Sequence, residues 1–151
     1  MWIERDISQK IKDLAQGFPA IVLTGARQTG KTSLLRKLFA DYTYVSLDIP
    51  STAALASHSP EEFLSRYHTP LLVDEVQYAP ELSRHLKVVI DRDRHTMGQF
   101  ILTGSQKFPL MQHVADSLAG RCALALCIGQ SVYAGDRANV FDRQRVLRSK
   151  L

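Results

Sequence analysis

Short unbroken runs of apolar residues alternate along the chain with segments whose apolar residues recur at helical spacing. Apolar runs without polar alternation are typical of parallel strands that are buried on both faces. They predict five strands, at Ala20–Leu23, Thr43–Leu47, Pro70–Val73, Gln99–Leu102 and Cys122–Ile128. Their alternation with helices predicts an α/β domain, in which helices cover both faces of a mostly parallel sheet.

Amphipathic spacing predicts the helices. The first is expected over 3–16, where apolar residues recur between charged ones at Ile3, Ile7, Ile11 and Leu14. Further helices are predicted at about 31–40, 80–94 and 108–118, and proline and acids open a short one at 60–62. Residues 49–59, rich in Ser, Ala and Pro, are expected to form a loop.

Composition narrows the class of protein without naming a function. The 151 residues fit one domain, and 45% hydrophobic with 23% charged residues is ordinary for a globular chain. The net charge of +4 admits nucleotides or nucleic acid as partners but establishes neither.

Cysteine usage and the apolar runs predict a soluble cytoplasmic protein. Cys122 and Cys127 form no CxxC pair and are expected to be reduced core residues. No apolar run approaches the roughly 18 residues that span a bilayer, so no membrane partner is expected. The charged N-terminus also lacks the apolar segment of a signal peptide.

A candidate phosphate cradle follows the first predicted strand. Residues 25–32 match the P-loop pattern G-x-x-x-x-G-K-[ST], whose backbone N–H groups turn toward phosphate oxygens at a helix N-terminus. Lys31 would reach the outer phosphates, and the Thr32 hydroxyl would ligate Mg²⁺. A plain strand–helix turn is the alternative. The predicted nucleotide-binding residues are Gly25, Ala26, Arg27, Gln28, Thr29, Gly30, Lys31, Thr32 and Ser33.

Polar residues that end later strands supply the remaining candidates. Asp74 is placed to hold Mg²⁺ and Glu75 to activate water, although adjacent acids also occur in solvated turns. Ser105 follows the next strand and either contacts the γ-phosphate or caps a helix. Arg121 either faces the γ-phosphate, in its own subunit or a neighbour's, or is a surface residue. The five histidines are scattered, without metal-ligand spacing.

Five separated motifs resemble one known family. "TGARQTGKTSLL", "YVSLD", "PLLVDEVQYAPEL", "FILTGSQ" and "SLAGR" are similar to the bacterial and archaeal AAA+-like ATPases that pair a P-loop domain with a C-terminal domain of uncharacterised function. The resemblance covers about 3–121. It implies ATP and Mg²⁺ as ligands and a three-layer P-loop NTPase fold with a five-stranded sheet of order 5-1-4-3-2.

The resemblance also implies roles for single residues. Lys31 and Thr32 would be the cradle residues, and Ser105 would stand at the sensor position. Asp74 and Glu75 would be the metal and water acids, and Arg121 belongs to a Gly-Arg element. Gln77, in "DEVQ", would hydrogen-bond near the water or hold the loop.

The similarity fails after residue 128. We therefore expect an ATPase core at 1–128 and a tail at 129–151. Between Arg137 and Lys150 this tail contains five basic residues and one acidic residue. The chain ends at Leu151 without the second domain, which favours a truncated product, with a change of reading frame near 129 as one hypothesis. The basic tail admits nucleic acid as a partner, but a solvated segment is the alternative.

These observations lead to one main hypothesis and two alternatives. The main one is an ATP-binding domain with slow Mg²⁺-dependent hydrolysis, which a neighbouring copy in a homo-oligomer could assist. A non-hydrolysing nucleotide-binding module, or an inactive remnant, is the first alternative. A GTPase or small-molecule kinase is the second; the N-K-x-D guanine motif is absent, since the only asparagine is Asn139.

Overall fold

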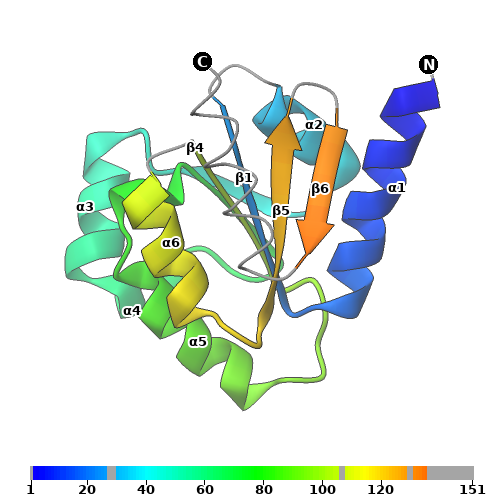
Figure 1. Cartoon of the computed structure of the whole chain (residues 1–151). Coiled ribbons are helices and arrows are strands. Elements are labelled where there is room, and N and C mark those ends of the chain that lie inside the picture. Colours follow the sequence, from blue (N-terminus) through cyan, green and yellow to red (C-terminus); the bar gives the residue numbers. More distant parts are fainter. Residues whose placement is uncertain (1, 27–29, 106–107, 129–130, 136–151) are drawn as a thin grey trace.

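The computed structural model describes residues 2–26, 30–105, 108–128 and 131–135, which form one sheet with helices on both faces (Figure 1). The strands are β1 (Ala20–Gly25), β2 (Thr43–Ser46), β3 (Leu71–Asp74), β4 (Phe100–Ser105), β5 (Cys122–Ile128) and β6 (Ser131–Gly135). The helices are α1 (Trp2–Gly17), α2 (Lys31–Leu38), α3 (Pro50–His58), α4 (Pro60–Arg66), α5 (Leu82–Arg92) and α6 (Phe108–Ser117), with a 3₁₀ turn at Val76–Tyr78.

The strand order confirms the predicted sheet. The six strands lie in the order β2-β3-β4-β1-β5-β6, and the first five are mutually parallel. Reading this order from β5 to β2 gives 5-1-4-3-2, as the resemblance implies. β1 therefore lies at the centre, and β4 separates it from β3. Because parallel strands end at the same edge, the residues that follow β1, β3 and β4 lie close together.

A sixth strand extends the sheet beyond the predicted core. β6 pairs antiparallel with β5, from Leu124↔Gly135 to Ile128↔Ser131. The sequence reading did not predict it, because a short strand at the sheet edge lacks the apolar run that marks a strand buried on both faces.

The loop predicted at 49–59 is wrong, because residues 50–58 form α3. Pro50 stands at the first turn, where proline fits a helix. Three of the other residues of α3 are alanine, which has the highest helix propensity, but only Ala56 of α3 is fully buried. A helix with so little apolar periodicity is hard to recognise from spacing alone.

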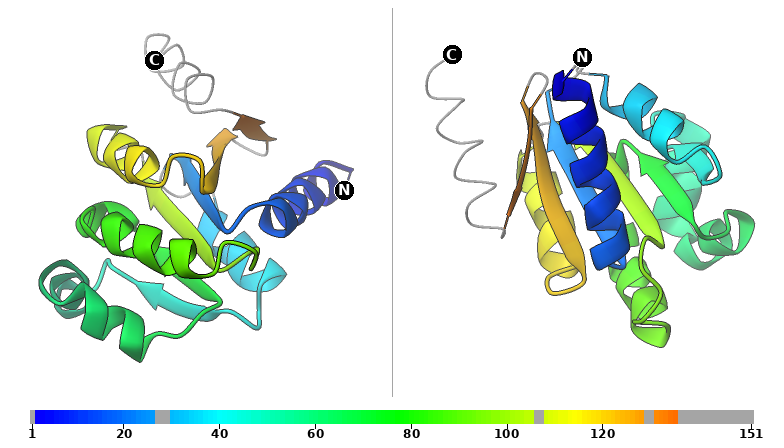
Figure 2. Two further views of the ribbon diagram at one scale, coloured as in Figure 1. Left: turned by 90° about the horizontal axis from the view of Figure 1, so that it is seen from below. Right: turned by 90° about the vertical axis from the view of Figure 1, so that its right-hand side faces the viewer.

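Two apolar layers hold the helices to the sheet. α1 and α2 cover one face, where Ile11 and Leu35 pack on Ile21 and Leu72. α3 to α6 cover the other face around Phe63, Phe100 and other buried side chains, so that the sheet is the middle of three layers (Figure 2). None of the helices in the described ranges combines the length and the apolar character needed to cross a membrane.

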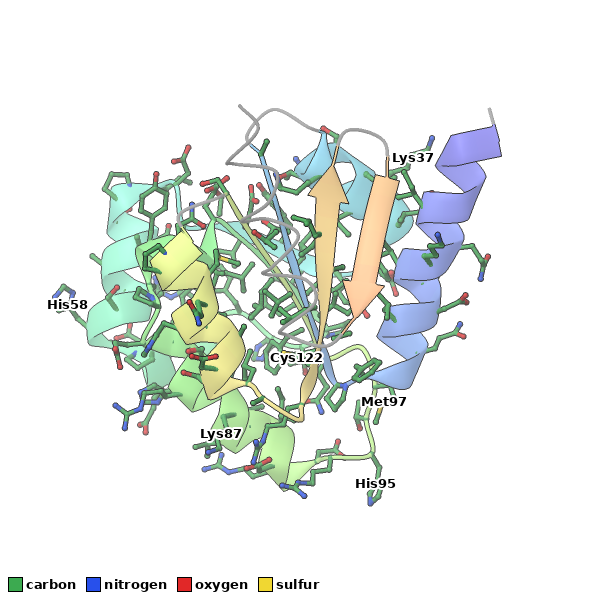
Figure 3. The ribbon with its side chains drawn as sticks, viewed as in Figure 1. Lys37, His58, Lys87, His95, Met97 and Cys122 are labelled. Atoms are coloured by element: carbon green, nitrogen blue, oxygen red, sulfur yellow. The ribbon has the colours of Figure 1, made fainter. Side chains whose placement is uncertain are left out.

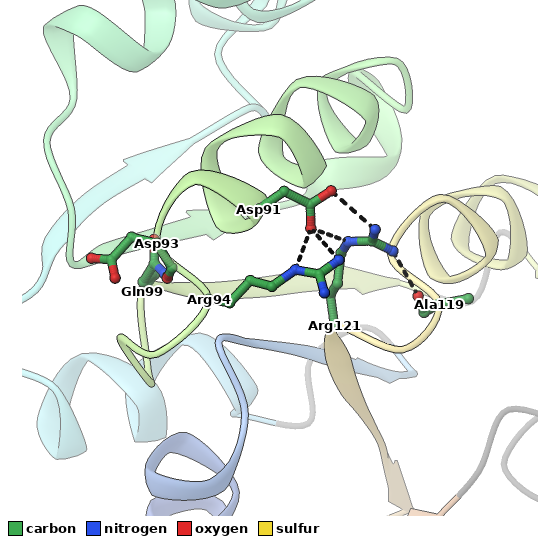
Figure 4. Close-up of polar contacts among 6 residues, drawn as sticks. All are labelled: Asp91, Asp93, Arg94, Gln99, Ala119 and Arg121. Carbon is green, nitrogen blue, oxygen red and sulfur yellow. Dashed lines mark hydrogen bonds and ion pairs between the residues drawn. The ribbon is translucent and has the colours of Figure 1, made fainter.

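An ion-pair brace holds the amino end of β5. Arg121 Nε donates to Asp91 Oδ1 of α5 at 2.6 Å and Nη2 donates to Oδ2 at 3.0 Å, while Nη1 donates to the Ala119 carbonyl at 3.0 Å (Figure 4). Arg94 Nη2 approaches the same carboxylate at 3.3 Å. The backbone of Arg121 also accepts the Ala20 N–H at 3.3 Å. The brace therefore joins α5, β5 and β1 where the strands begin.

We predict that Arg121→Gln lowers the melting temperature by a few degrees in a pH-dependent way. The hydrogen bond from Arg121, and secondarily the charges of Arg121 and Arg94, lower the pKa of Asp91 from its ordinary 3.8. The stabilisation is therefore fully present above pH 3.8 and is lost as the pH falls through the lower, folded-state pKa. Thermal melts should show a difference near neutral pH that shrinks in acid.

Arg66→Gln is the matched control. It removes an exposed helical ion pair with Glu62 at 3.1 Å, which should contribute little. Equal effects of the two substitutions at neutral pH would contradict the brace.

Candidate functional site

The candidate phosphate cradle begins where β1 ends. Gly25 closes the strand, and Gly30 precedes α2 with φ 73°, a left-handed conformation that glycine adopts readily. α2 then starts at Lys31, so its positive end faces the loop. Ser33 is exposed on the first turn, whereas the predicted contacts of Arg27, Gln28 and Thr29 lie outside the described residues.

The Lys31 side chain lies over this loop. Its Nζ donates to the carbonyl oxygens of Gly25, at 3.2 Å, and Ala26. Burial lowers the pKa of Lys31, and this effect is opposed by the nearby Cys127, Glu75 and Asp74. The ammonium is thus held beside the carbonyls of Gly25 and Ala26, at the start of the candidate cradle.

Close packing against β5 requires glycine at position 25. A Cβ there would lie 2.6 Å from the carbonyl oxygen and 3.1 Å from the Cβ of Cys127. Burial raises the pKa of the Cys127 thiol to about 11, against the opposing charge of Lys31, so the thiol stays protonated beside the loop. Burial likewise raises the pKa of Cys122 to about 12, and both cysteines are free thiols.

Three hydroxyl groups surround the Asp74 carboxylate at the end of β3. Thr32 Oγ1 donates to Oδ1 at 3.0 Å, which joins the cradle helix to the acid. The buried Thr103 of β4 also donates to Oδ1 and accepts the Glu75 N–H at 3.4 Å. Tyr44 of β2 donates to Oδ2 at 3.0 Å. The structure therefore brings the predicted metal residues, Thr32 and Asp74, together.

Glu75, Gln77 and Ser105 form a second polar group beside Asp74. Glu75 adopts φ 59°, which costs a non-glycine residue roughly 1–2 kcal/mol. The Gln77 amide Nε2 donates to Glu75 Oε2 and, at 3.1 Å, to Ser105 Oγ. Gln77 Oε1 is buried without a hydrogen-bond partner among the described residues. The buried Gln77 thus holds the predicted water acid and the predicted sensor hydroxyl to one another.

Gly104 provides the space for this arrangement. A Cβ there would lie 2.8 Å from Gln77 Oε1 and would also overlap the Met111 sulfur. The alternative in which Ser105 caps the following helix depends on residues 106 and 107, which lie outside the described residues.

The structure does not bring Arg121 to this site. It precedes β5, which spans about 20 Å at a rise of 3.3 Å per residue, and the site lies beyond the other end. Cys122, the next residue, is labelled at the lower end of β5 in Figure 3. The expectation that Arg121 faces a phosphate in its own subunit therefore does not match its position, because both edges of its guanidinium are engaged in the brace.

The residues present fit a magnesium–nucleotide ligand. Mg²⁺ is usually bound through one or two carboxylates together with waters and phosphate oxygens, and prefers such hard oxygen donors. Thr32 and Asp74 offer oxygens of this kind next to the cradle. No group of three or more His, Cys, Asp or Glu within the described residues could hold a metal alone. His58 and His95, for example, lie on separate outer parts of the molecule (Figure 3).

Sequence reasoning missed the role of two hydroxyls. The sequence contains a signal for Thr103, because this residue directly follows the apolar run of a predicted strand and lies close to the predicted sensor residue Ser105. Tyr44 had none, because its contact depends on the alignment of β2 with β3, in which Ser46 is opposite Asp74. The basic residues at 137–150, which suggested nucleic acid, lie outside the described residues.

The order of the parallel strands and the helices on both faces define a P-loop nucleoside triphosphatase fold. A family model described as an AAA domain matches residues 17–131. The chain belongs to this AAA domain family, which implies a nucleotide ligand.

Two similar curated proteins extend the comparison. An uncharacterized protein from Mycobacterium bovis and another from Mycobacterium tuberculosis are each 31% identical over 134 residues. The aligned region covers 87% of this chain but 30% of each relative. The chain thus spans about three-tenths of the length of the curated relatives that it matches.

We predict that Gly25→Ala disrupts the cradle. The added methyl group meets the backbone of β5, which cannot move as a side-chain tip can, so we expect a loss of about 1–3 kcal/mol of stability, typical of overpacking. Nucleotide affinity should fall with it. Thermal melts and binding titrations measure the two effects.

Gly17→Ala is the control for this substitution. Nothing lies within 4 Å of a Cβ at Gly17, at the end of α1. This variant should be neutral or slightly more stable. A Gly25→Ala protein as stable as Gly17→Ala would show that the close approach does not constrain the cradle.

Proposed function

We propose that this domain binds ATP with Mg²⁺ and hydrolyses it slowly. The observation that carries the proposal is the 3.0 Å hydrogen bond between Thr32 Oγ1 and Asp74 Oδ1. It places the candidate metal acid directly beside the candidate phosphate cradle. A strand–helix turn with no ligand would not need an acid, 42 residues away in sequence, at this point.

The binding part rests on Lys31 and the N-terminus of α2. The ammonium contacts two loop carbonyls, and the first turn of α2 offers backbone N–H groups that no intrahelical bond uses. Phosphate oxygens would replace carbonyl oxygens as partners of Lys31. Adenine as the base comes from the family resemblance rather than from a base-contacting residue.

The metal part rests on Thr32 and Asp74. A bound Mg²⁺ would neutralise charge that develops on the phosphoryl oxygens. Thr32 and Asp74 are the residues that would hold it, directly or through water. Thr103 keeps the carboxylate in place from β4.

The hydrolytic part rests on Glu75. Its carboxylate is the candidate group to orient a water and accept its proton. Gln77 holds that carboxylate, and Ser105 lies on the same amide. The left-handed backbone at Glu75 is the kind of local strain that clusters at functional sites.

Two features support slow turnover. The Glu75 carboxylate already accepts a hydrogen bond from Gln77, which would compete with a water molecule for it. Arg121 lies at the other end of the sheet, so its charge does not reach the candidate site. A neighbouring copy that brings a cation to the cradle would supply the missing charge in a homo-oligomer. The engaged Glu75 also favours the second candidate function, a module that binds nucleotide without turnover.

We predict that Glu75→Gln lowers hydrolysis of Mg·ATP by about 100-fold or more, the range for loss of a general base. Nucleotide affinity should stay within about twofold, because the amide keeps the size of the side chain. Phosphate release and equilibrium binding measure the two effects. The control is Glu81→Gln, which changes an exposed acid directly before α5 and should alter neither value.

The possible outcomes separate the two candidate functions. Turnover by the parent that disappears in Glu75→Gln supports an ATPase. Tight binding by both proteins without turnover supports the binding module. Absence of Mg·ATP binding by the folded parent contradicts both.

We predict that Lys31→Ala weakens Mg·ATP binding by roughly 10- to 100-fold. A hydrogen bond to a charged group contributes about 1.5–3 kcal/mol, and this variant removes the ammonium that faces the loop. The fold should persist, since Lys31 is only partly buried. Lys37→Ala, an exposed lysine at the far end of α2, is the control (Figure 3). Equal affinities in the two variants would contradict the cradle.

A further inference from the structure

Both oxygens of Asp74 are held by hydroxyl donors from three different elements. Oδ1 accepts from Thr32 of α2 and Thr103 of β4. Oδ2 accepts from Tyr44 of β2 alone among the described hydrogen bonds, at 3.0 Å. The hydrogen bond from Tyr44 therefore restricts the position of the second oxygen, and its loss would leave the carboxylate free to rotate.

Tyr44 is itself held by the cradle helix. The guanidinium carbon of Arg36 lies 4.5 Å from the centroid of the Tyr44 ring, within the range of a cation–π contact. Arg36 is four residues after Thr32 on α2, so the two side chains lie on the same face of that helix. The helix thus reaches Asp74 by two routes, directly through Thr32 and indirectly through Arg36 and Tyr44.

We propose that Tyr44 is a positioning residue that fixes the Asp74 carboxylate for magnesium, and that Arg36 holds the tyrosine ring in place. The inference rests on the proposed function for the identity of the metal. A carboxylate with both oxygens held enters the metal site in one orientation, and loss of such a supporting contact typically weakens metal binding 10- to 100-fold.

The environment of the phenol suits this role. A phenol hydroxyl is a proton donor throughout the neutral range, so it can hold a carboxylate oxygen there. Since Tyr44 is only half-buried and β2 is an edge strand, packing alone does not require its hydroxyl.

The test compares Tyr44→Phe with Tyr42→Phe. Each variant loses one tyrosine hydroxyl. That of Tyr44 contacts Asp74 and also Ser46, whereas that of Tyr42 donates to the Gly98 carbonyl, at 2.6 Å, away from the cradle. Fluorescent ADP is titrated with each folded protein at increasing Mg²⁺ and also in EDTA. Binding of Mn²⁺ to the protein–ADP complex, followed by electron paramagnetic resonance, reports the metal directly.

Tyr44→Phe should raise the Mg²⁺ concentration for half-maximal effect about 10-fold or more, with ADP affinity in EDTA unchanged. Tyr42→Phe should leave both values at those of the parent. Arg36→Met should give a smaller shift, about two- to fivefold, since an exposed cation–π contact is worth about 0.5–1 kcal/mol.

Three results would overturn the inference. Parental Mg²⁺ and Mn²⁺ dependence in Tyr44→Phe would show that the hydroxyl does not position the metal acid, while the proposed function would stand. Equal shifts in Tyr44→Phe and Tyr42→Phe would assign the effect to general stability. Failure of the parent to bind Mg·ADP or Mg·ATP would overturn the proposed function and this inference together.

Discussion

The hydrogen bond between Thr32 and Asp74 is the interaction on which the site depends. It joins the first turn of α2 to the end of β3 across the intervening strand β4. It forms only if β1, β4 and β3 are neighbours and all run in the same direction. The same topology places Thr103, two residues before the end of β4, between Thr32 and the acids, where it contacts both Asp74 and Glu75. The order of the strands therefore determines which residues meet at the site.

The two ends of the sheet have different chemistry. At the carboxyl end, hydroxyls and an amide surround two acids, and a partly buried lysine covers the loop. At the amino end, a bidentate arginine–aspartate pair joins α5 to β5. Between them the strands are apolar on both faces. The groups that would meet a ligand are thus separated from the brace by the length of a strand.

The sequence predicted most elements because they depend on strong signals, and the resemblance to the ATPase family implied the strand order that the structure has. The P-loop pattern and the unbroken apolar runs can be recognised without tertiary contacts. α3 was missed because alanine propensity leaves no apolar periodicity, and β6 because it lies at the edge. Arg121 could not be assigned from a motif, because its partner Asp91 is 30 residues away and carries no signal of its own. Tyr44 depends on strand alignment, which the sequence did not reveal.

β2 has four residues and forms one margin of the sheet, with β3 as its neighbour on one side. Short marginal strands open more readily than central ones and exchange their amide hydrogens at lower free energy. β1, enclosed by β4 and β5, would exchange mainly when the whole domain unfolds. The candidate phosphate cradle therefore begins at the most protected strand, whereas one support of Asp74 belongs to a segment that can open locally. Such an opening would loosen the Asp74 carboxylate while leaving the end of β1 intact.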